Sequence, residues 1–415
     1  MADPTPARPR PNLIPLAGVV LLYLYAMMIA VASNNFQDFF IYRVGAVIAL
    51  KGETPYDVPK VRALVAEQFP DPDAQPDSLV NNCGYFPPPL ALVLYLPFAA
   101  VPWPAAKLLW AATTLFAAWA VTKLPGLFLR PGEPAPPVAG VWQFVPIVLV
   151  LNTMMIAVVV VGQTTLVFVA AVAAGQLCFE RGRNALGSLL WAIPFIKPHL
   201  ALPLILLAWY IGGWRRAALV LGCVAVLNLI GAAMVGPDPI TALRAYFDYV
   251  PNAHKEVLYN RAELNPQIAS WNRLWYAYTG QLVELTIVTT VAGYAVWFGL
   301  VAGRCALAAE WPSPSWAASA AAAGGLLCCQ VLGYELLLFT LAVPWLRDLG
   351  AAGYRWRVGL GVGLIVFEFF VTQSIFKPIG LESTRPLGVA LFALLVLVGP
   401  INPLKAQGRS SLGLG

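Results

Sequence analysis

Charged residues are scarce in this chain. Of 415 residues only 11% are charged, whereas 59% are hydrophobic. Soluble domains average about 25% charged residues and about half apolar ones. Apolar surface on this scale needs lipid around it, so the composition excludes a soluble globular domain and predicts an integral membrane protein.

Metal-binding patterns are also scarce. The chain has two histidines and six cysteines, and neither a CxxC nor an HExxH spacing occurs. Cys83 stands in a long polar loop, and the other cysteines lie in or beside apolar runs. Because structural metal sites and disulfide frameworks depend on such spacings, we predict no metal site built on His and Cys and no cofactor. Whether a divalent metal assists at Asp38 stays open.

The formal charge of +6 does not indicate a nucleic-acid partner. Lys and Arg fall at the ends of apolar runs, as in membrane proteins, where they fix orientation. The glycines of GLGVG at 359–363 lie inside an apolar run, which favours helix packing over a phosphate-binding loop. We therefore predict no nucleic-acid partner and no cytoplasmic nucleotide site.

Long apolar runs dominate what is present. A transmembrane helix needs about 20 mostly apolar residues. The first run is too long for the core of a signal peptide, so it is predicted to be an uncleaved helix. We predict an all-α membrane protein of about twelve transmembrane helices in one domain, 1–415. The runs are 13–33, 104–122, 141–161, 164–179, 184–196, 199–213, 217–235, 284–303, 315–331, 333–346, 357–372 and 386–402.

The proline-rich stretch 86–103 decides the topology. If it stays at the outer face, the Lys and Arg pairs of the short loops all lie in the cytoplasm, together with both termini. If it crosses, every pair after the first moves outside, which opposes insertion. We therefore predict a non-crossing segment. The outer segments are then the first loop 34–103, the turns 162–163 and 197–199, the second large loop 236–283, and 373–385.

Asp38 opens the first outer loop. It precedes a predicted helix that ends at Gly52, and a second short helix is predicted over 57–69. An acid at a helix N-terminus can serve as a cap with a favourable dipole contact. A catalytic role is the alternative, and both interpretations stay open at this point.

Lys197 lies in the apolar sequence AIPFIKPHLALPL. A cation there costs about 2.5–3.5 kcal/mol unless it reaches water or an anion. It either extends to the interface or, with His199, binds a phosphate at the outer face. Glu335 and Glu368 lie near the outer ends of their runs, where each either faces a polar cavity or pairs with an arginine.

Other polar residues share this outer side. Gln163 forms a turn between two spans. The aromatic loop 236–283 either covers a cavity or lies in the interface. The outer cations are candidate partners for the acids or for lipid headgroups: Arg43, Arg273, Lys377 and Arg385.

Several sequence pieces carry a resemblance between residues 34 and about 346. They are DFFIYRVGAVIALKGETPYD, YFPPPLALVLYLPF, the Gly162-Gln163 turn, FIKPHLALPLILL followed by Trp214-Arg215-Arg216, and GYELLLFTLAVPW. In order and spacing they resemble the family-87 glycosyltransferases of the GT-C superfamily. These are polytopic enzymes that take sugar from a polyprenyl-phosphate donor, and they include polyprenyl-phosphate-mannose-dependent mannosyltransferases.

The resemblance implies a GT-C helical bundle in the bacterial inner membrane, with its active site on the extracytoplasmic side. It implies that Asp38 is the catalytic base of an inverting transfer of a hexose such as mannose to a lipid or glycan acceptor. Lys197, with His199 and Arg273, is then expected to bind the donor phosphate. The expected substrate cavity includes Arg43, Tyr85, Gln163, Tyr334, Glu335 and Glu368.

Tyr334 and Glu335 stand where the better-known mannosyltransferases of the family carry histidine, so the resemblance leaves the sugar open. Two other functions also stay open. A lipid transporter or flippase usually shows internal repeats and charges near the midplane, and neither is evident here. A non-catalytic scaffold for envelope assembly would tolerate neutralisation of Asp38 and Lys197.

Overall fold

The computed structural model describes most of the chain after residue 35. The described residues are 21, 24, 25, 28, 36–68, 85–129, 158–159, 161–236, 238–256, 268–284, 286–308, 310–329, 331–370 and 384–404. Within them every regular element is a helix, which confirms the predicted all-α class.

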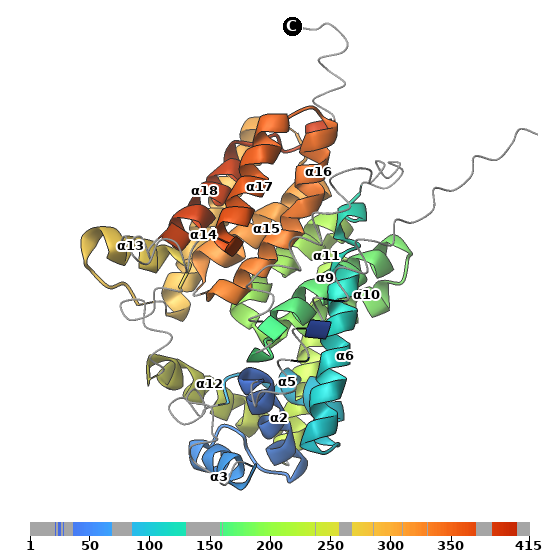
Figure 1. The fold of residues 1–415 in the computed structure, drawn as a ribbon, viewed down its shortest axis with the longest axis vertical. Helices are drawn as coiled ribbons and strands as arrows, with labels where there is room; N and C mark the ends of the chain where they lie inside the picture. Colours follow the sequence, from blue (N-terminus) through green and yellow to red (C-terminus); the bar gives the residue numbers. More distant parts are fainter. Residues whose placement is uncertain are drawn as a thin grey trace, which may run out of the picture.

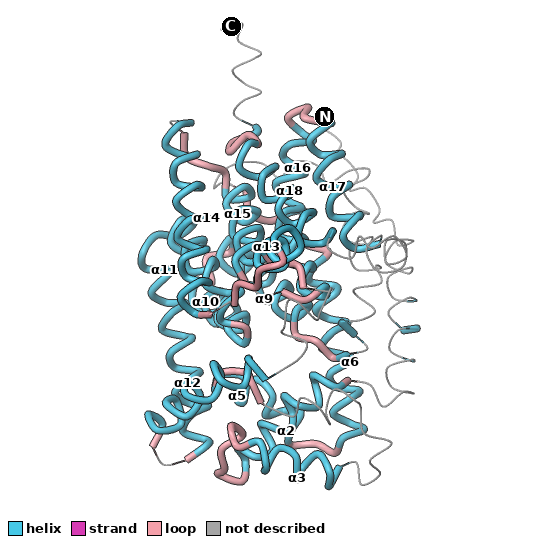
Figure 2. The backbone as a smooth tube through the Cα atoms, turned by 90° about the vertical axis from the view of Figure 1, so that its left-hand side faces the viewer, coloured by secondary structure: helices cyan, strands magenta, loops and turns pink. Residues whose placement is uncertain are grey.

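The α-helices are α2 (Gln37–Leu50), α3 (Val58–Gln68), α5 (Pro89–Ala99), α6 (Trp103–Val121), α9 (Thr165–Glu180), α10 (Asn184–Ala192), α11 (Pro198–Val235), α12 (Pro239–Glu256), α13 (Trp271–Thr279), α14 (Ile287–Ala308), α15 (Pro314–Cys328), α16 (Val343–Ala351), α17 (Arg355–Phe370) and α18 (Thr384–Val398). Three 3₁₀ helices connect them: η2 (Leu124–Gly126), η4 (Ile193–Ile196) and η6 (Gly333–Ala342). Helices α14 to α18 form the upper part of Figure 1, whereas α2, α3, α5 and α12 form the lower end. Figure 2 shows the same division from the side.

Three described helices are long and apolar enough to cross a membrane: Trp103–Gly126, Pro198–Val235 and Ile287–Ala308. The predicted count of about twelve spans is therefore not confirmed. Most of the expected runs 13–33 and 141–161 lies outside the described residues. Several other expected spans form apolar helices of 10–17 residues, because prolines and short turns divide them.

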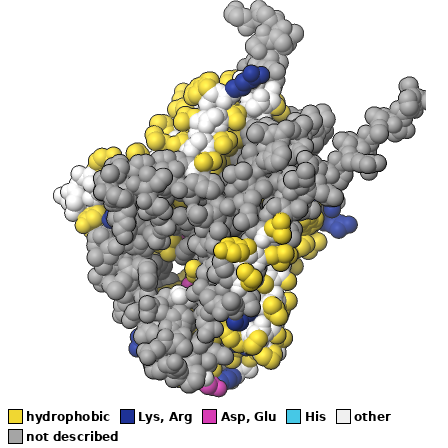
Figure 3. Space-filling model, in the orientation of Figure 1, with side chains coloured by type: hydrophobic (Ala, Val, Ile, Leu, Met, Phe, Trp, Pro, Cys, Tyr) yellow, Lys and Arg dark blue, Asp and Glu magenta, His cyan; other side chains and the backbone are white. Residues whose placement is uncertain are grey.

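Large apolar side chains cover much of the described outer surface. On α6, Leu108 is 61% exposed and Phe116 63%, and on α14 Val288 is 76% exposed. Figure 3 shows yellow side chains over the described parts of one face, with scattered Lys and Arg among them. A surface of this kind suits lipid rather than water.

Helix α11 contains both predicted spans 199–213 and 217–235, and it reverses direction between them. Gly213 lies inside it with φ 72°, a left-handed conformation that favours glycine. A straight helix from Lys197 to Gly231 would be ~50 Å long. Yet Gly231 lies against Pro89 at the start of α5, and α5 also contacts η4, directly before Lys197. The two halves of α11 therefore run side by side.

The proline-rich stretch 86–103 forms α5 and the start of α6. Helix α5 has 11 residues, with Pro97 inside it, and is roughly 16 Å long. A bilayer core is about 30 Å thick. Helix α5 packs against α2 and α11 and is too short to cross, as expected for a non-crossing segment.

The basic segments between helices gather at one end of the bundle. Glu180 at the end of α9 accepts a hydrogen bond from the Phe128 amide, 3.0 Å away. The Arg216 guanidinium lies 4.2 Å from the ring centre of Phe179. Arg347 donates to the carbonyl of Pro125. These contacts join the ends of α6, α9, the α11 reversal and α16.

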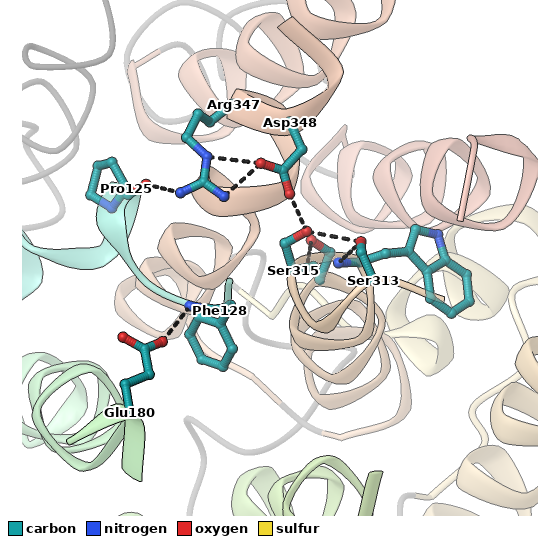
Figure 4. A network of polar contacts seen from close by, with 9 residues as sticks. Pro125, Phe128, Glu180, Ser313, Ser315, Arg347 and Asp348 are labelled. Carbon is teal, nitrogen blue, oxygen red and sulfur yellow. Dashed lines mark hydrogen bonds and ion pairs between the residues drawn. The ribbon is translucent and has the colours of Figure 1, made fainter. Parts of the chain in front are cut away.

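Arg347 is buried at this end. Its guanidinium binds the carboxylate of the neighbouring Asp348, with Nε to Oδ1 at 2.8 Å. The other Asp348 oxygen accepts from Ser315 Oγ, which lies 2.9 Å from Ser313 Oγ (Figure 4). This network fastens α16 to the start of α15 and, through Pro125, to the end of α6.

Removal of Asp348 should destabilise the fold. We expect Asp348→Ala to lower the free energy of unfolding by about 3 kcal/mol, because Arg347 stays buried without its counter-charge. Thermal unfolding of the purified protein in detergent would measure the loss. Lys60→Ala is the matched control, because its ion pair with Glu53 is 43% and 45% exposed and screened by solvent, so its loss should change stability little. Equal melting temperatures for the two variants would contradict this role.

Candidate functional site

Asp38 lies in the first turn of α2, as predicted, but it does not act as a side-chain cap. The N-cap residue is Phe36, in a left-handed conformation, and the helix has no side-chain cap. The Asp38 carboxylate instead accepts a hydrogen bond from Nε2 of Gln163. Asp38 therefore faces another segment of the protein, and Gln163 is its partner.

The Gly162 turn places Gln163 against α2. Gly162 has φ 77°, which favours glycine, and a Cβ atom there would collide with Cβ of Phe39. Only a residue without a side chain allows the backbone before α9 to approach α2 this closely. The sequence predicted this turn but not its contact with Asp38.

Lys197 holds the centre of the site. Its ammonium donates to Oε1 of Gln163 at 2.9 Å, to Oε1 of Glu335 at 2.8 Å and to Oγ1 of Thr165 at 3.4 Å. An ammonium has three donors, and these three acceptors match them. Lys197 is 8% exposed. Its charge is thus met by an anion inside the protein rather than by extension to the interface.

Glu335 is the anion that meets Lys197. It lies in the first turn of η6 and is 5% exposed. While Oε1 binds Lys197, Oε2 accepts from the backbone amide of Leu332 at 2.7 Å. The backbone contact fixes the carboxylate, so Glu335 holds the Lys197 ammonium in place. The expected alternative of an arginine partner is replaced by a lysine.

We call Asp38, Gln163, Lys197 and Glu335 the polar network. It lies at the Thr165 end of α9, whereas the basic segments gather at the Glu180 end. A helix of this length is ~24 Å long. The network and the basic end are therefore separated by most of the height of the bundle.

The electrostatics of the network favour a base that works near neutral pH. Burial raises the pKa of Asp38 to about 6; the Lys197 charge opposes this shift, and Glu335 adds to it. A catalytic base is most effective when its pKa lies near the working pH. The raised pKa means that the Asp38 carboxylate binds a proton more readily than an exposed aspartate does.

Tyr42 joins the site without having been predicted. It follows Asp38 by one helical turn and shares its face of α2. Burial raises its pKa, and the nearby Asp38 carboxylate raises it further. The i, i+4 spacing from Asp38 was the signal in the sequence that could have identified Tyr42.

Arg43 and Tyr85, two expected cavity residues, have structural contacts. Arg43 Nε donates to the carbonyl of Phe98 at 2.9 Å, and Nη2 donates to that of Val101 at 2.7 Å. The Tyr85 ring is fully buried against Gly45 of α2. Arg43 thus holds the turn between α5 and α6, and Tyr85 lies on the Asp38 side of α2.

His199 and Arg273, two other expected site residues, contact tyrosine side chains. The carbonyl of His199 accepts from the Tyr294 hydroxyl at 2.6 Å. Arg273 is buried on α13, with its guanidinium 5.6 Å from the ring centre of Tyr276. The side chains of Tyr334, Glu368 and Arg385, and all of Lys377, lie outside the described part of the chain.

Metal ligands do not cluster at this site. Among the described residues, no group of three His, Cys, Asp or Glu side chains is placed to hold a metal ion. The site offers instead a buried carboxylate and a cation, an arrangement that suits proton transfer next to an anionic group.

The Lys197–Glu335 ion pair should be strongly coupled. We expect Lys197→Met to cost about 3–5 kcal/mol of stability, because it leaves a buried carboxylate unpaired. The double variant Lys197→Met/Glu335→Gln should be more stable than Lys197→Met alone. Melting temperatures of wild type, both single variants and the double variant would complete the cycle. Strictly additive losses would contradict the coupling.

The sequence profile of glycosyltransferase family 87 matches residues 85–340, which is more than half of the chain. A search of curated proteins finds no match. The matched region contains Gln163, Lys197 and Glu335, and it begins after α2, so Asp38 lies before it. On this match the chain belongs to glycosyltransferase family 87.

Proposed function

We propose that this glycosyltransferase moves a hexose such as mannose from a polyprenyl-phosphate donor to a lipid or glycan acceptor, with inversion, on the extracytoplasmic side of the membrane. One observation carries the proposal. A buried ammonium, Lys197, is joined through Gln163 to a carboxylate, Asp38, whose pKa suits a base. The reaction needs both groups, one for the acceptor hydroxyl and one for the phosphate.

The separation of charges supports the sidedness. Lys and Arg concentrate in the cytoplasmic loops of membrane proteins. The basic segments gather at the Glu180 end of α9, and the polar network lies at the opposite end. With the basic end in the cytoplasm, the network faces the outer leaflet, where a donor carried on a lipid is within reach.

Asp38 would act as the general base. Its carboxylate takes the proton from an acceptor hydroxyl while that oxygen attacks the anomeric carbon of the donor sugar. The bond from this carbon to the phosphate oxygen breaks, and the polyprenyl phosphate leaves with the electron pair. A positioned base contributes roughly 10²–10⁴-fold to the rate.

Lys197 would stabilise the negative charge that grows on the leaving phosphate. Its three donors already have acceptors, so one contact must be exchanged when the phosphate binds. The contact to Thr165, at 3.4 Å, is the longest of the three and the one we expect to be released. Glu335 keeps the ammonium in place during this exchange.

Arg273 is the candidate for a second cation. The carboxylates of Asp38 and Glu335 carry two negative charges against the one positive charge of Lys197. A bound phosphate would add further negative charge. Arg273 lies in the first turn of α13, and the segment directly before that helix is fixed by a 2.9 Å hydrogen bond from Ala269 N to Val331 O, next to η6. This backbone connection between the start of α13 and the start of η6 supports Arg273 as the candidate.

Gln163 would position the base. Its carbonyl oxygen accepts from Lys197, so its amide nitrogen must face Asp38. Glu335, Lys197 and Gln163 thereby orient the Asp38 carboxylate from one side, much as a third group orients the base in other catalytic sites.

Asp38→Asn should abolish sugar transfer while the protein stays folded, because the amide cannot accept the proton. Purified protein would be incubated with a panel of polyprenyl-phosphate sugars and membrane lipid extract, with products identified by mass spectrometry. Glu53→Gln is the control, since it makes the same chemical change at an exposed site of the same outer loop. Full activity of Asp38→Asn would refute the assigned role.

The same assay tests the two alternative functions. Donor binding without product in the wild type would favour a transporter, and activity unaffected by neutralising both Asp38 and Lys197 would favour a scaffold.

The activity should fall as the pH drops through about 6, because protonation of Asp38 removes the base. In Gln163→Leu this limb of the pH profile of kcat/KM should move to higher pH, since the variant loses a hydrogen bond to the ionised carboxylate. Initial rates between pH 4.5 and 8.5 would test both expectations. An unshifted limb in Gln163→Leu would show that Gln163 does not act through Asp38.

A further inference from the structure

Several buried polar atoms without hydrogen bonds pack against α2. Among them are the hydroxyls of Tyr85 and Tyr95 and the indole N–H of Trp110; each is sealed from solvent and has no hydrogen-bond partner in the described structure. More than about 90% of buried polar groups in proteins are paired. We call these three residues the unpaired cluster.

Helix α2 brings the unpaired cluster next to the base. Asp38, Tyr42 and Gly45 share one face of this helix, since they are spaced by four and three residues. The Tyr85 ring lies directly against Gly45, so closely that a Cβ atom there would collide with it. The Tyr95 ring centre lies 5.0 Å from that of Tyr42.

Trp110 completes the unpaired cluster. Its ring centre lies 5.6 Å from that of Tyr95 and 4.8 Å from that of Phe39, the residue after Asp38. Thr164 follows Gln163 in the chain and interacts with the Tyr42 side chain. The segment before α5, α5 itself and α6 therefore each pack one residue of the unpaired cluster against α2.

The chemistry of the cluster matches a neutral, hydroxyl-rich ligand. Tyr hydroxyls both donate and accept hydrogen bonds, and the indole donates. All three side chains are aromatic and uncharged. A sugar ring presents several hydroxyls together with apolar C–H faces, so it could satisfy the polar atoms and pack on the rings.

Packing alone does not explain the hydroxyls. Phe in place of Tyr85 or Tyr95 would fill the same space and would leave no buried oxygen unpaired, and an unpaired buried polar group lowers stability. We propose that the unpaired cluster binds the ring of a sugar during transfer. The proposal rests on the proposed function, and the sugar is that of the donor or that of the acceptor.

Phe variants separate binding from stability. Without ligand, Tyr85→Phe and Tyr95→Phe should melt at the wild-type temperature or about 2 °C above it, because an unpaired hydroxyl is removed. Each should raise KM for the sugar-bearing substrate about 2- to 10-fold, the range expected for one lost neutral hydrogen bond. Tyr210→Phe is the matched control, since its hydroxyl already donates to Pro312 at the other end of the bundle. It should melt lower and keep both KM values.

A melting experiment tests the cluster without turnover. The full chain in detergent would be melted alone, with polyprenyl phosphate, and with polyprenyl-phosphate mannose, glucose or galactose. If the cluster holds the donor sugar, a sugar-bearing donor should raise the melting temperature more than polyprenyl phosphate does, and Tyr95→Phe should reduce that excess. If it holds the acceptor sugar, only the KM for the acceptor should rise.

Two results would overturn the proposal. One is that both Phe variants keep the wild-type KM for donor and acceptor and the full melting response to sugar. The other is that both melt clearly below the wild type without ligand, which would show that the hydroxyls are already paired. In either case, transfer that depends on Asp38 would leave the proposed function intact. Loss of all transfer in the wild type would refute that function, and the melting experiment would still decide whether the cluster binds sugar.

Discussion

The interaction on which the site depends is the buried ion pair between Lys197 and Glu335. An ammonium inside an apolar bundle is stable only where an anion and further acceptors meet it. Glu335 supplies the charge, the Leu332 amide fixes Glu335, and Gln163 and Thr165 supply the remaining acceptors. The pair therefore fixes three separate elements, η6, α9 and the start of α11, around one nitrogen atom.

The Lys197–Glu335 pair also determines how the Asp38 carboxylate is held. Because Lys197 occupies the carbonyl of Gln163, the amide nitrogen turns to Asp38, and the Gly162 turn allows the close approach that this contact needs. At the other end of the bundle a second buried pair, Arg347 and Asp348, fastens α16 to α15 and to the end of α6 (Figure 4). The helices are thus fixed by polar contacts at both ends, while their apolar outer faces suit lipid.

The polar side chains around α2 fall into two groups that differ in their hydrogen bonding. The polar network satisfies its own charges, whereas the neighbouring aromatic residues keep several polar atoms unpaired. An unpaired polar group in a native interior calls for an explanation, and a functional site is one of them. The contrast between the satisfied network and the unpaired aromatic residues separates the groups proposed to act on the acceptor and the phosphate from those proposed to bind a sugar.

The sequence by itself determined the helical class, the membrane environment and the identity of the unusual polar residues. Composition and run length sufficed for the first two, and the rarity of an acid or a lysine beside apolar runs identified Asp38, Lys197 and Glu335. Tertiary structure alone decided their pairing, because contacts such as Lys197 to Glu335 join segments far apart in the chain. It also decided that Arg43 and Arg347 bind backbone carbonyls, that Tyr42 lies beside the base, and that α11 reverses at Gly213. Periodicity and composition report on a residue's immediate neighbours, whereas these contacts depend on how whole helices pack.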